Sequence, residues 1–247
     1  MIDNYFKNRF TVRLFSDKEV CQDLIDEIVE AAMHAPTCGN MQLYTVIETR
    51  DKVMKTKLEA LHFNQPAAAT APVILTVCAD FNRFSRWCEL EGAVPGYSNF
   101  HSFIVAMTDA VIFAQQICTL AEMEGLGTCY LGTVNYNAKE ISELLELPEL
   151  VVPVASIAIG YPKGGSEIVE RLPVKAILHR EKYRKDSADE IKNLFRVKDE
   201  FPQNQEFVKL NNMPSLAHLF TEIRYPKKMN EEVSKSFEEL IKEKFMK

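Results

Sequence analysis

The sequence has no excess of basic residues, no secretory signal and no apolar run of membrane-spanning length. Its 29 lysines and arginines stand against 35 aspartates and glutamates, for a formal charge of -6, so it lacks the broad positive field of a nucleic-acid binder. The longest apolar stretches, residues 67–79 and 150–160, fall short of the roughly 20 residues that cross a bilayer. The first residues lack the apolar centre of a secretory signal. We therefore expect a soluble cytoplasmic protein with neither a nucleic-acid nor a membrane partner.

Motifs of several common enzyme classes are also missing. The six cysteines contain no CxxC pair, and we interpret them as reduced packing residues. The five histidines show no ligand spacing, so no metal site is predicted. There is no GxSxG element of a hydrolase and no GxxxxGK[ST] element of a P-loop ATPase. Gly125-Leu126-Gly127 is not a dinucleotide-binding motif either, because the sixth position is Tyr130 and the motif follows a predicted helix.

The patterns that are present indicate one main domain in which helices and strands interleave. A chain of 247 residues with 47% apolar content can bury one sizeable core. Ser16 and Glu19 have the spacing of a capping box, which predicts a helix that starts there and ends near Pro36. The remaining periodicity predicts helices over 52–61 and 138–145, and strands over 42–49, 73–79, 129–131 and 151–159. This order is typical of a layered domain of mixed α and β structure.

Three further segments complete the organisation. Residues 103–124 are apolar nearly all round, which predicts a helix covered on every side by its own domain or by a partner subunit, with Gly125 as a left-handed cap. Residues 184–229 are charged and lack a clear period, so we expect an irregular excursion or wrapping arm. Residues 230–247 predict an amphipathic helix, capped by Asn230, that packs on the core or on a partner. The main core is accordingly assigned to residues 1–183.

An anion-binding segment is predicted close to the amino terminus. In an extended chain, residues two apart point to the same side, so Arg9, Thr11 and Arg13 share one face while Phe10 and Val12 face the core. Guanidinium groups suit a phosphate because they donate paired, charge-assisted hydrogen bonds, and a hydroxyl adds another. Taken alone, the segment also fits an ordinary solvated basic strand.

The turn after the first predicted helix carries two amides among small residues. Asn40 and Gln42 can both donate and accept hydrogen bonds, which suits a ring edge with alternating donors and acceptors. Without the other segments, Gly39-Asn40 is also a simple turn signal.

Together these segments resemble the flavin-dependent nitroreductase family, and within it the NADPH-preferring nitroreductase and flavin reductase subgroup. The resemblance runs from about Phe6 to Tyr183. The segments that carry it are Arg9-Phe10-Thr11-Val12-Arg13, Ala35-Pro36-Thr37-Cys38-Gly39-Asn40-Met41-Gln42, Gly125-Leu126-Gly127-Thr128-Cys129-Tyr130-Leu131-Gly132, and Gly160-Tyr161-Pro162 with Arg171-Leu172-Pro173. It implies an α+β, three-layer fold whose central mixed, mainly antiparallel sheet is flanked by helices. It also implies a homodimer with swapped or embracing extensions and FMN at the subunit interface.

By the same resemblance, FMN is the cofactor. The segment from Arg9 to Arg13 and the separate Arg171 would hold its phosphate and ribityl chain, and the backbone N–H of Gly132 would approach N5 of the ring. The implied cofactor-binding residues are Arg9, Phe10, Thr11, Arg13, Pro36, Thr37, Asn40, Gln42, Gln65, Tyr130, Leu131, Gly132, Thr133 and Arg171. The chain departs from the family pattern at Phe10, Val169 and Thr133, which stand where a basic residue, a lysine and a glycine are usual.

The activity implied is hydride transfer from NADPH or NADH, through FMN, to nitroaromatics, quinones or free flavin by a ping-pong mechanism. The cofactor would carry the chemistry, so no catalytic side chain is required, and Arg13 would tune the flavin electrostatically. Alternatives are a flavin enzyme of another reaction on the same fold, such as dehalogenation or flavin destruction, an FMN-binding protein that stores or senses the cofactor without turnover, and an apo structural dimer. The choice between NADPH and NADH is open, with Arg184, Arg196 and Arg224 as candidates for contacts to a 2′-phosphate.

Overall fold

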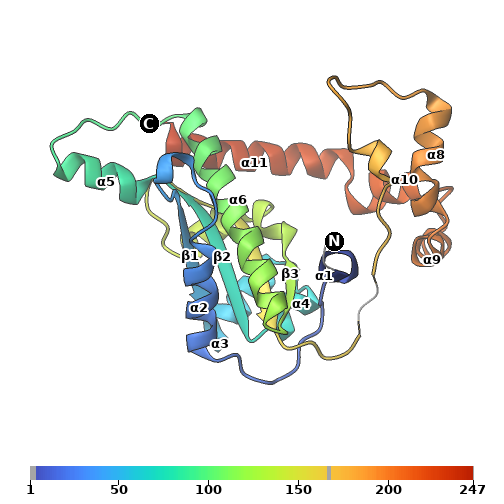
Figure 1. The fold of residues 1–247 in the computed structure, drawn as a ribbon, viewed down its shortest axis with the longest axis horizontal. Helices are drawn as coiled ribbons and strands as arrows, with labels where there is room; N and C mark the ends of the chain where they lie inside the picture. The colour runs from blue at the N-terminus through green and yellow to red at the C-terminus, as the bar shows by residue number, and fades with distance from the viewer. Residues whose placement is uncertain (1–3, 166–167, 247) are drawn as a thin grey trace. The chain divides into compact units, whose positions relative to one another are not determined.

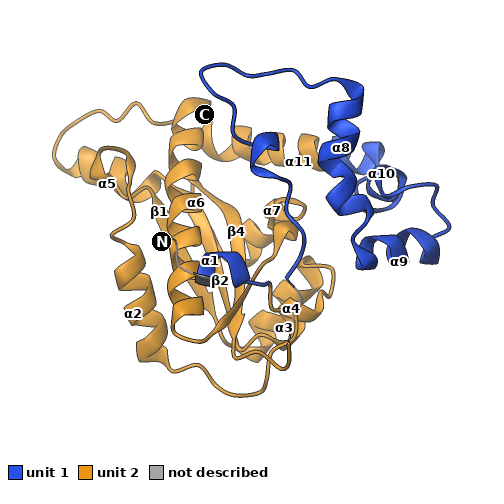
Figure 2. Ribbon diagram, turned by 45° about the vertical axis from the view of Figure 1, so that its right-hand side comes forward, with its two compact units in different colours: residues 1–10, 167–232 blue, residues 11–166, 233–247 orange. Residues whose placement is uncertain are grey.

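The computed structural model describes residues 4–165 and 168–246 (Figure 1) and divides into two compact units. Unit 1 comprises residues 1–10 and 167–232, and unit 2 comprises residues 11–166 and 233–247 (Figure 2). These boundaries differ from the predicted ones at residues 183 and 229. The predicted division into domains stays a prediction. The sheet and most of the described hydrophobic core belong to unit 2.

Unit 2 is built on a four-stranded sheet in the order β1-β2-β4-β3, in which every neighbouring pair is antiparallel. The strands are β1 (Tyr44–Thr49), β2 (Val73–Asp80), β3 (Gly127–Tyr130) and β4 (Val151–Gly160). The two central strands, β2 and β4, are buried along their whole length, as their nearly continuous apolar sequences predict. All four strands were predicted from the sequence, with ends that differ by one or two residues. Because β2 and β4 are the central strands, β1 and β3 form the edges of the sheet.

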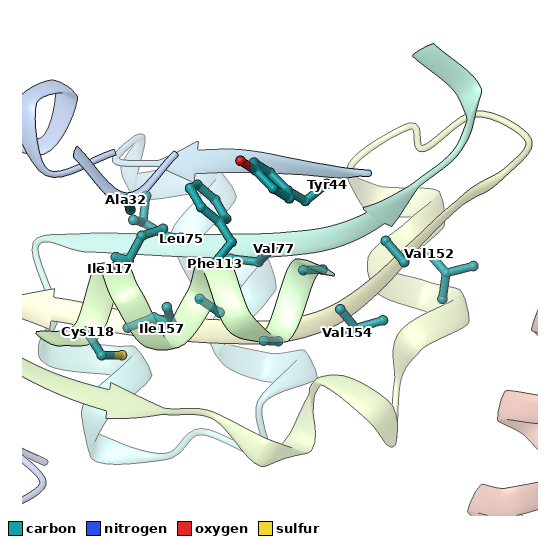
Figure 3. Close-up of a cluster of buried hydrophobic side chains, with 14 of the residues drawn as sticks. Ala32, Tyr44, Leu75, Val77, Phe113, Ile117, Cys118, Val152, Val154 and Ile157 are labelled. Carbon is teal, nitrogen blue, oxygen red and sulfur yellow. The ribbon is translucent and has the colours of Figure 1, made fainter. Parts of the chain in front are cut away.

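Alternate residues of the central strands face opposite helix layers. Leu75 and Val77 of β2 lie in one cluster with Ile157 of β4 (Figure 3), whereas Cys78 packs with Val151 in a separate cluster. The register between β2 and β4 shifts between Val77 and Cys78, so that Cys78 pairs with Pro153. Proline cannot donate a ladder hydrogen bond, and its place beside this irregularity is where a sheet interior tolerates it.

Helices cover both faces of this sheet, which makes the α+β, three-layer arrangement that the resemblance implied. On one face lie α2 (Gln22–Ala32) and the long α6 (Phe100–Met123), which contact each other. The other helices of unit 2 include α3 (Lys52–Leu61), α4 (Pro66–Thr70) and α7 (Ala138–Leu144), of which α7 contacts both β4 and α3. A further helix, α5 (Asn82–Leu90), was not predicted from the sequence.

Helix α6 has one buried face and one apolar face that its own chain leaves open. Its buried stripe includes Phe103, Phe113 and Ile117 and packs on all four strands of the sheet. Side chains on the open face include Phe100, Ile104, Val111 and Ile112. By length and composition α6 is the one helix among the described residues that could cross a membrane. Its packing against the sheet is that of a core helix.

The predicted capping box at Ser16 and Glu19 is wrong, because α2 begins only at Gln22. The Ser16 backbone N–H instead donates to the carbonyl of Tyr161 at 2.8 Å, and Phe15 forms a β-bridge with Pro162. These contacts hold the segment extended beside the end of β4, so its backbone cannot also start a helix.

The terminal helix, α11 (Lys227–Phe245), begins before Asn230, so the predicted cap is also wrong. Its apolar stripe is confirmed and packs on the chain's own core, where the rings of Phe103 and Phe245 lie 5.4 Å apart. The Lys244 carbonyl accepts a hydrogen bond from the Leu150 backbone N–H at 3.1 Å. Residue 247 of the predicted helix lies outside the described residues.

Unit 1 is more helical than its composition suggests. It contains α1 (Asn4–Asn8), η3 (Val174–Ala176), α8 (Ala188–Asp199), α9 (Pro202–Leu210), α10 (Leu216–His218) and η4 (Leu219–Arg224). The expectation of irregular structure over 184–229 is therefore wrong. Ser187 and Glu190 form a capping box at the start of α8, and Pro202 occupies the first turn of α9. Both signals are readable in the sequence.

Candidate functional site

The part of the predicted phosphate segment that belongs to unit 2, from Thr11 to Arg13, lies along the β3 edge of the sheet. The Val12 backbone N–H donates to the carbonyl of Thr128 at 3.0 Å, and the Val12 side chain is buried. A Cβ on Gly127 would lie 2.4 Å from a methyl group of Val12, so the glycine makes room for this contact. Because neighbouring side chains of an extended segment alternate, Thr11 and the exposed Arg13 lie on the face opposite Val12, as predicted.

The turn after β3 presents an open position next to this segment. Leu131 is buried and its N–H donates to Ser156 at 2.8 Å, whereas Tyr130 and Gly132 are exposed. Gly132 opens the 3-10 helix η2 (Gly132–Asn135), and a Cβ built there would meet no atom within 4 Å. The chain itself therefore does not require glycine at this position. The surface beside Gly132 is free for a ligand to approach its backbone.

A buried histidine links two predicted site residues beside that turn. His62 follows α3, and its Nδ1 lies 2.8 Å from Oγ1 of Thr133. Its backbone carbonyl accepts the N–H of Gln65 at 3.2 Å. Burial lowers the pKa of His62 to about 4, so its ring is neutral near pH 7. The sequence left His62 as a packing, capping or solvent-facing residue, because nothing local connects residues 62 and 133.

The predicted amide turn lies at the other edge of the sheet, before β1. It contains η1 (Cys38–Asn40), and Gly39, Asn40 and Gln42 all have φ between 53° and 57°. The buried carboxylate of Asp109 in α6 accepts hydrogen bonds from the N–H of Cys38 at 2.9 Å and of Leu43 at 3.4 Å. These bonds hold the turn in an unusual backbone shape that exposes Asn40.

A cavity of about 330 Å³ adjoins this turn, and the sequence did not point to it. Its lining includes Gln42, Tyr44, Thr45, Arg83 and Phe113. The guanidinium of Arg83 donates to the carbonyls of Gln42 at 2.8 Å and of Tyr44 at 3.0 Å. Burial, followed by the negative charge of Asp109, raises the pKa of Tyr44, so its hydroxyl is protonated at neutral pH.

The predicted site residues of unit 2 thus fall into two groups, at opposite edges of the sheet. We call them the β3-edge group and the β1-edge turn. The first consists of Thr11, Arg13, Gln65, Tyr130, Leu131, Gly132 and Thr133. The second consists of Pro36, Thr37, Asn40 and Gln42. The strand order puts three strand spacings of about 4.8 Å, or about 14 Å, between β1 and β3. One copy of the chain therefore does not bring the two groups together.

The remaining predicted residues, Arg9, Phe10 and Arg171, belong to unit 1. Arg171 is exposed, and its Nη1 donates to the carbonyls of Val169 at 3.2 Å and Glu170 at 3.0 Å. The neighbouring Glu170 carboxylate accepts bonds from Lys198 at 2.8 Å and from Asn204 at 3.1 Å. Glu170 therefore attaches the Arg171 segment to α8 and α9 within unit 1.

The three arginines considered for a nucleotide phosphate already have interaction partners. Arg184 contacts Asp186 and Glu190, and its Nη1 lies 2.8 Å from the latter carboxylate. Arg196 donates to the side-chain oxygen of Asn193. Arg224 lies over the ring of Phe207, 5.0 Å from the centroid. A phosphate at any of these positions would compete with those contacts.

The β3-edge group combines an exposed cation, a hydroxyl, an amide and a position without a side chain. Such a set can hold a flat, negatively charged ligand, because it offers donors for the charge and room beside the backbone. Among the described residues no group of three or more histidine, cysteine or acidic side chains is placed to hold a metal ion.

Comparisons with known proteins identify the family. The model of the nitroreductase family matches residues 6–161. The chain belongs to the nitroreductase family. It is 35% identical over 226 residues to an FMN reductase [NAD(P)H] of Bacillus subtilis, an alignment that covers 87% of this chain and 89% of the relative. It is also 33% identical over 191 residues to a Cr(VI) reductase of a Pseudomonas strain, covering 77% of this chain and 79% of the relative.

Among solved structures, the fold is similar to that of a putative oxidoreductase from Bacteroides fragilis. The TM-score is 0.96 at 42% sequence identity, and the alignment covers 98% of each chain. This similarity extends through both units, whereas the family model ends at residue 161. The predicted family and the predicted α+β fold are therefore confirmed.

Proposed function

We propose that this nitroreductase-family chain is an FMN-dependent oxidoreductase that takes hydride from NADPH or NADH and delivers it to nitroaromatics, quinones or free flavin. The names of the relatives support this function, one of them being an FMN reductase [NAD(P)H]. The observation that carries it to this chain is the β3-edge group. There the Arg13 segment is bonded to β3 through Val12, the backbone of Gly132 is open, and His62 contacts both Gln65 and Thr133.

The residues of that group would divide the binding of FMN among them. Thr11 and Arg13 would hold the phosphate and ribityl part, because guanidinium groups bind phosphate through charge-assisted hydrogen bonds. The family resemblance assigns the phosphate to Arg9 and Arg171 as well. Gln65, Gly132 and Thr133 would contact the ring. FMN, when bound, supplies the hydride chemistry. Arg13 adds a fixed positive charge that favours the more negative reduced state of the cofactor.

A second copy of the chain would complete this site. The β1-edge turn carries its amides about 14 Å away from β3, so it would serve the β3-edge group of another copy rather than its own. The open apolar face of α6, with Val111 46% exposed and Ile112 39% exposed, suits a self-complementary interface. We therefore propose a homodimer in which each site uses residues of both copies. Its location would be the cytoplasm.

Turnover would be ping-pong, with the hydride donor and the acceptor occupying the same space beside the bound flavin in succession. No side chain of the group has to transfer a proton for this to work. The chain's role is to bind the cofactor, to fix its orientation and to set its potential. Which acceptors are reduced then depends on which molecules fit that space.

The first test is cofactor retention by the purified protein, with Arg13→Ala compared with Arg86→Ala, an exposed arginine on α5. We expect the wild type and the Arg86 variant to retain FMN, and the Arg13 variant to lose it more readily and to show a lower flavin potential. We expect Arg171→Ala to weaken retention with little change in potential. Equal potentials in the wild type and the Arg13 variant would refute the tuning role.

Turnover separates the enzyme from a storage or sensing protein. Steady oxidation of NADPH with an added quinone, with parallel double-reciprocal plots, is expected for the proposed mechanism. Tight FMN binding without oxidation of either nicotinamide would instead favour the storage alternative. A purified protein that binds no FMN at all would leave only the structural dimer.

The shared site is tested by breaking the interface. Val111→Glu places a charge on the open face of α6, and Val53→Glu places the same charge on the exposed surface of α3. We expect the first variant to become monomeric by light scattering and to lose FMN, and the second to behave as the wild type. A monomer that keeps FMN with unchanged affinity would contradict the proposal.

A further inference from the structure

The end of α3 is attached to the region after β3 by three neighbouring contacts. His62 Nδ1 and Thr133 Oγ1 are 2.8 Å apart. The flanking residues make parallel contacts: the Asn137 side chain donates to the carbonyl of Leu61, and the rings of Phe63 and Tyr136 meet edge to face at 5.9 Å. Three consecutive residues of one segment thus each contact the segment 133–137. The position of Thr133 is therefore fixed from outside its own turn.

His62 also contacts Gln65, through its backbone. The chain reverses after His62 through Phe63 and Asn64, both with positive φ, and the His62 carbonyl accepts the N–H of Gln65 at 3.2 Å. The ring of His62 and its backbone therefore contact two different residues of the β3-edge group.

The two nitrogens of the His62 ring decide the direction of the hydrogen bond to Thr133. Nε2 is buried and has no hydrogen-bond partner among the described residues. If Nε2 carried the proton, a buried donor would be left unpaired, which proteins avoid more strictly than an unpaired acceptor. The favoured tautomer therefore carries its proton on Nδ1 and donates it to Thr133 Oγ1. That arrangement leaves the hydroxyl proton of Thr133 free to be donated elsewhere.

Because burial lowers the pKa of His62 to about 4, the ring keeps this neutral form across the physiological range. Thr133 is half-buried and directly follows the exposed Gly132, which borders open space. A hydroxyl donor at this place would therefore adjoin the open surface beside Gly132, on which the proposed cofactor would bind.

We propose that His62 is a positioning residue that, as the Nδ1-protonated tautomer, orients the Thr133 hydroxyl to donate a hydrogen bond to an acceptor atom on the bound flavin ring. The inference rests on the proposed function. It assigns a role to a histidine that the hydride chemistry does not otherwise use, and it makes Thr133 a ligand-binding donor rather than a passive part of the turn.

The tautomer is read directly by long-range ¹H–¹⁵N NMR on the FMN-loaded protein with labelled histidine, with His62→Asn identifying the signal. We expect the Nδ1-protonated pattern, unchanged between pH 6 and 8. A signal from the Nε2-protonated form would overturn the proposal. This measurement needs no enzyme activity.

The donor role is read from FMN affinity. Thr133→Val removes the hydroxyl and keeps the shape, and Thr76→Val is the matched control, because Thr76 is fully buried in β2 with an unpartnered hydroxyl. Loss of one neutral hydrogen bond predicts binding about 2- to 12-fold weaker for Thr133→Val. Thr133→Ser and His62→Asn, which keep the two donors, are expected to bind within about twofold of the wild type.

The outcomes separate a failure of this inference from a failure of the proposed function. Unchanged affinity in Thr133→Val, in a protein whose wild type binds FMN, would overturn the role of Thr133 alone. The same would follow if Thr76→Val weakened binding equally, because the effect would then be general loss of stability. A wild type that binds no FMN would overturn the proposed function and this inference together.

Discussion

Removing the carboxylate of Asp109 should loosen one turn of the candidate site and cost about 3 kcal/mol of stability. Asp109 is only 3% exposed, and its two oxygens accept the backbone N–H groups of Cys38 and Leu43. Leu43 is fully buried, so its N–H cannot turn to water after Asp109→Ala. An unpaired buried donor such as the Leu43 N–H costs about 1–3 kcal/mol, and loss of the part-buried bond from Cys38 adds to this, which gives the sum stated.

The matched variant is Asp109→Asn, which keeps one oxygen acceptor and is expected to lose about half as much stability. Urea denaturation at pH 7 measures both differences. For a chain of this length, 3 kcal/mol corresponds to a melting temperature about 6–12 °C lower. Native-state hydrogen exchange then locates the effect, which we expect at the Leu43 amide first.

Two results would refute this reasoning. One is a stability within about 0.5 kcal/mol of the wild type for both variants, the range of ordinary surface substitutions. The other is faster exchange along the whole of α6 with no preference for Leu43. That pattern would mean that Asp109 stabilises its own helix rather than the β1-edge turn.

Three further predictions concern other parts of the chain. Gly127→Ala would bring a Cβ within 2.4 Å of the Val12 side chain and should destabilise by about 1–3 kcal/mol, and in urea denaturation the double variant with Val12→Ala should recover part of the loss. The pKa of His62 is about 4 in the folded chain against about 6.5 when unfolded, so its contribution to stability is complete above pH 6.5 and is lost as the pH falls towards 4. Denaturation of the wild type should show a loss of about 3 kcal/mol over that interval which His62→Leu lacks, and parallel curves would contradict it. Ser187→Ala removes the capping box of α8 and should cost about 1 kcal/mol, seen as faster amide exchange in the first turn of that helix and nowhere in the sheet.

Much of the secondary structure was predictable because its signals are local. The strands β2 and β4 are continuous apolar runs, and the left-handed cap at Gly125 has φ of 78° as its position predicts. The predicted start of α2 fails for the opposite reason. Ser16 and Glu19 carry a valid local signal, but bonding of the Ser16 backbone to Tyr161, far along the chain, overrides it.

The helices α8 and α9 show a different kind of failure. Their signals were present at Ser187, Glu190 and Pro202, but the charged composition of the segment concealed the period. The missed links in the site, Asp109 to Cys38 and His62 to Thr133, join residues 71 positions apart in each case. No pattern within a short window can indicate such pairs.

The sequence by itself indicated the family, through its resemblance to known members. It also indicated the layered α+β fold, the two buried central strands and the chemical types of the candidate site residues, because composition, periodicity and motif spacing are properties of neighbouring residues. Only the tertiary structure decided which of those residues share an edge of the sheet. Strand order depends on pairing between distant segments, and in this chain it places the β1-edge turn and the β3-edge group on opposite sides of β2 and β4. It likewise decided that a buried histidine, rather than the turn itself, holds Thr133 in place.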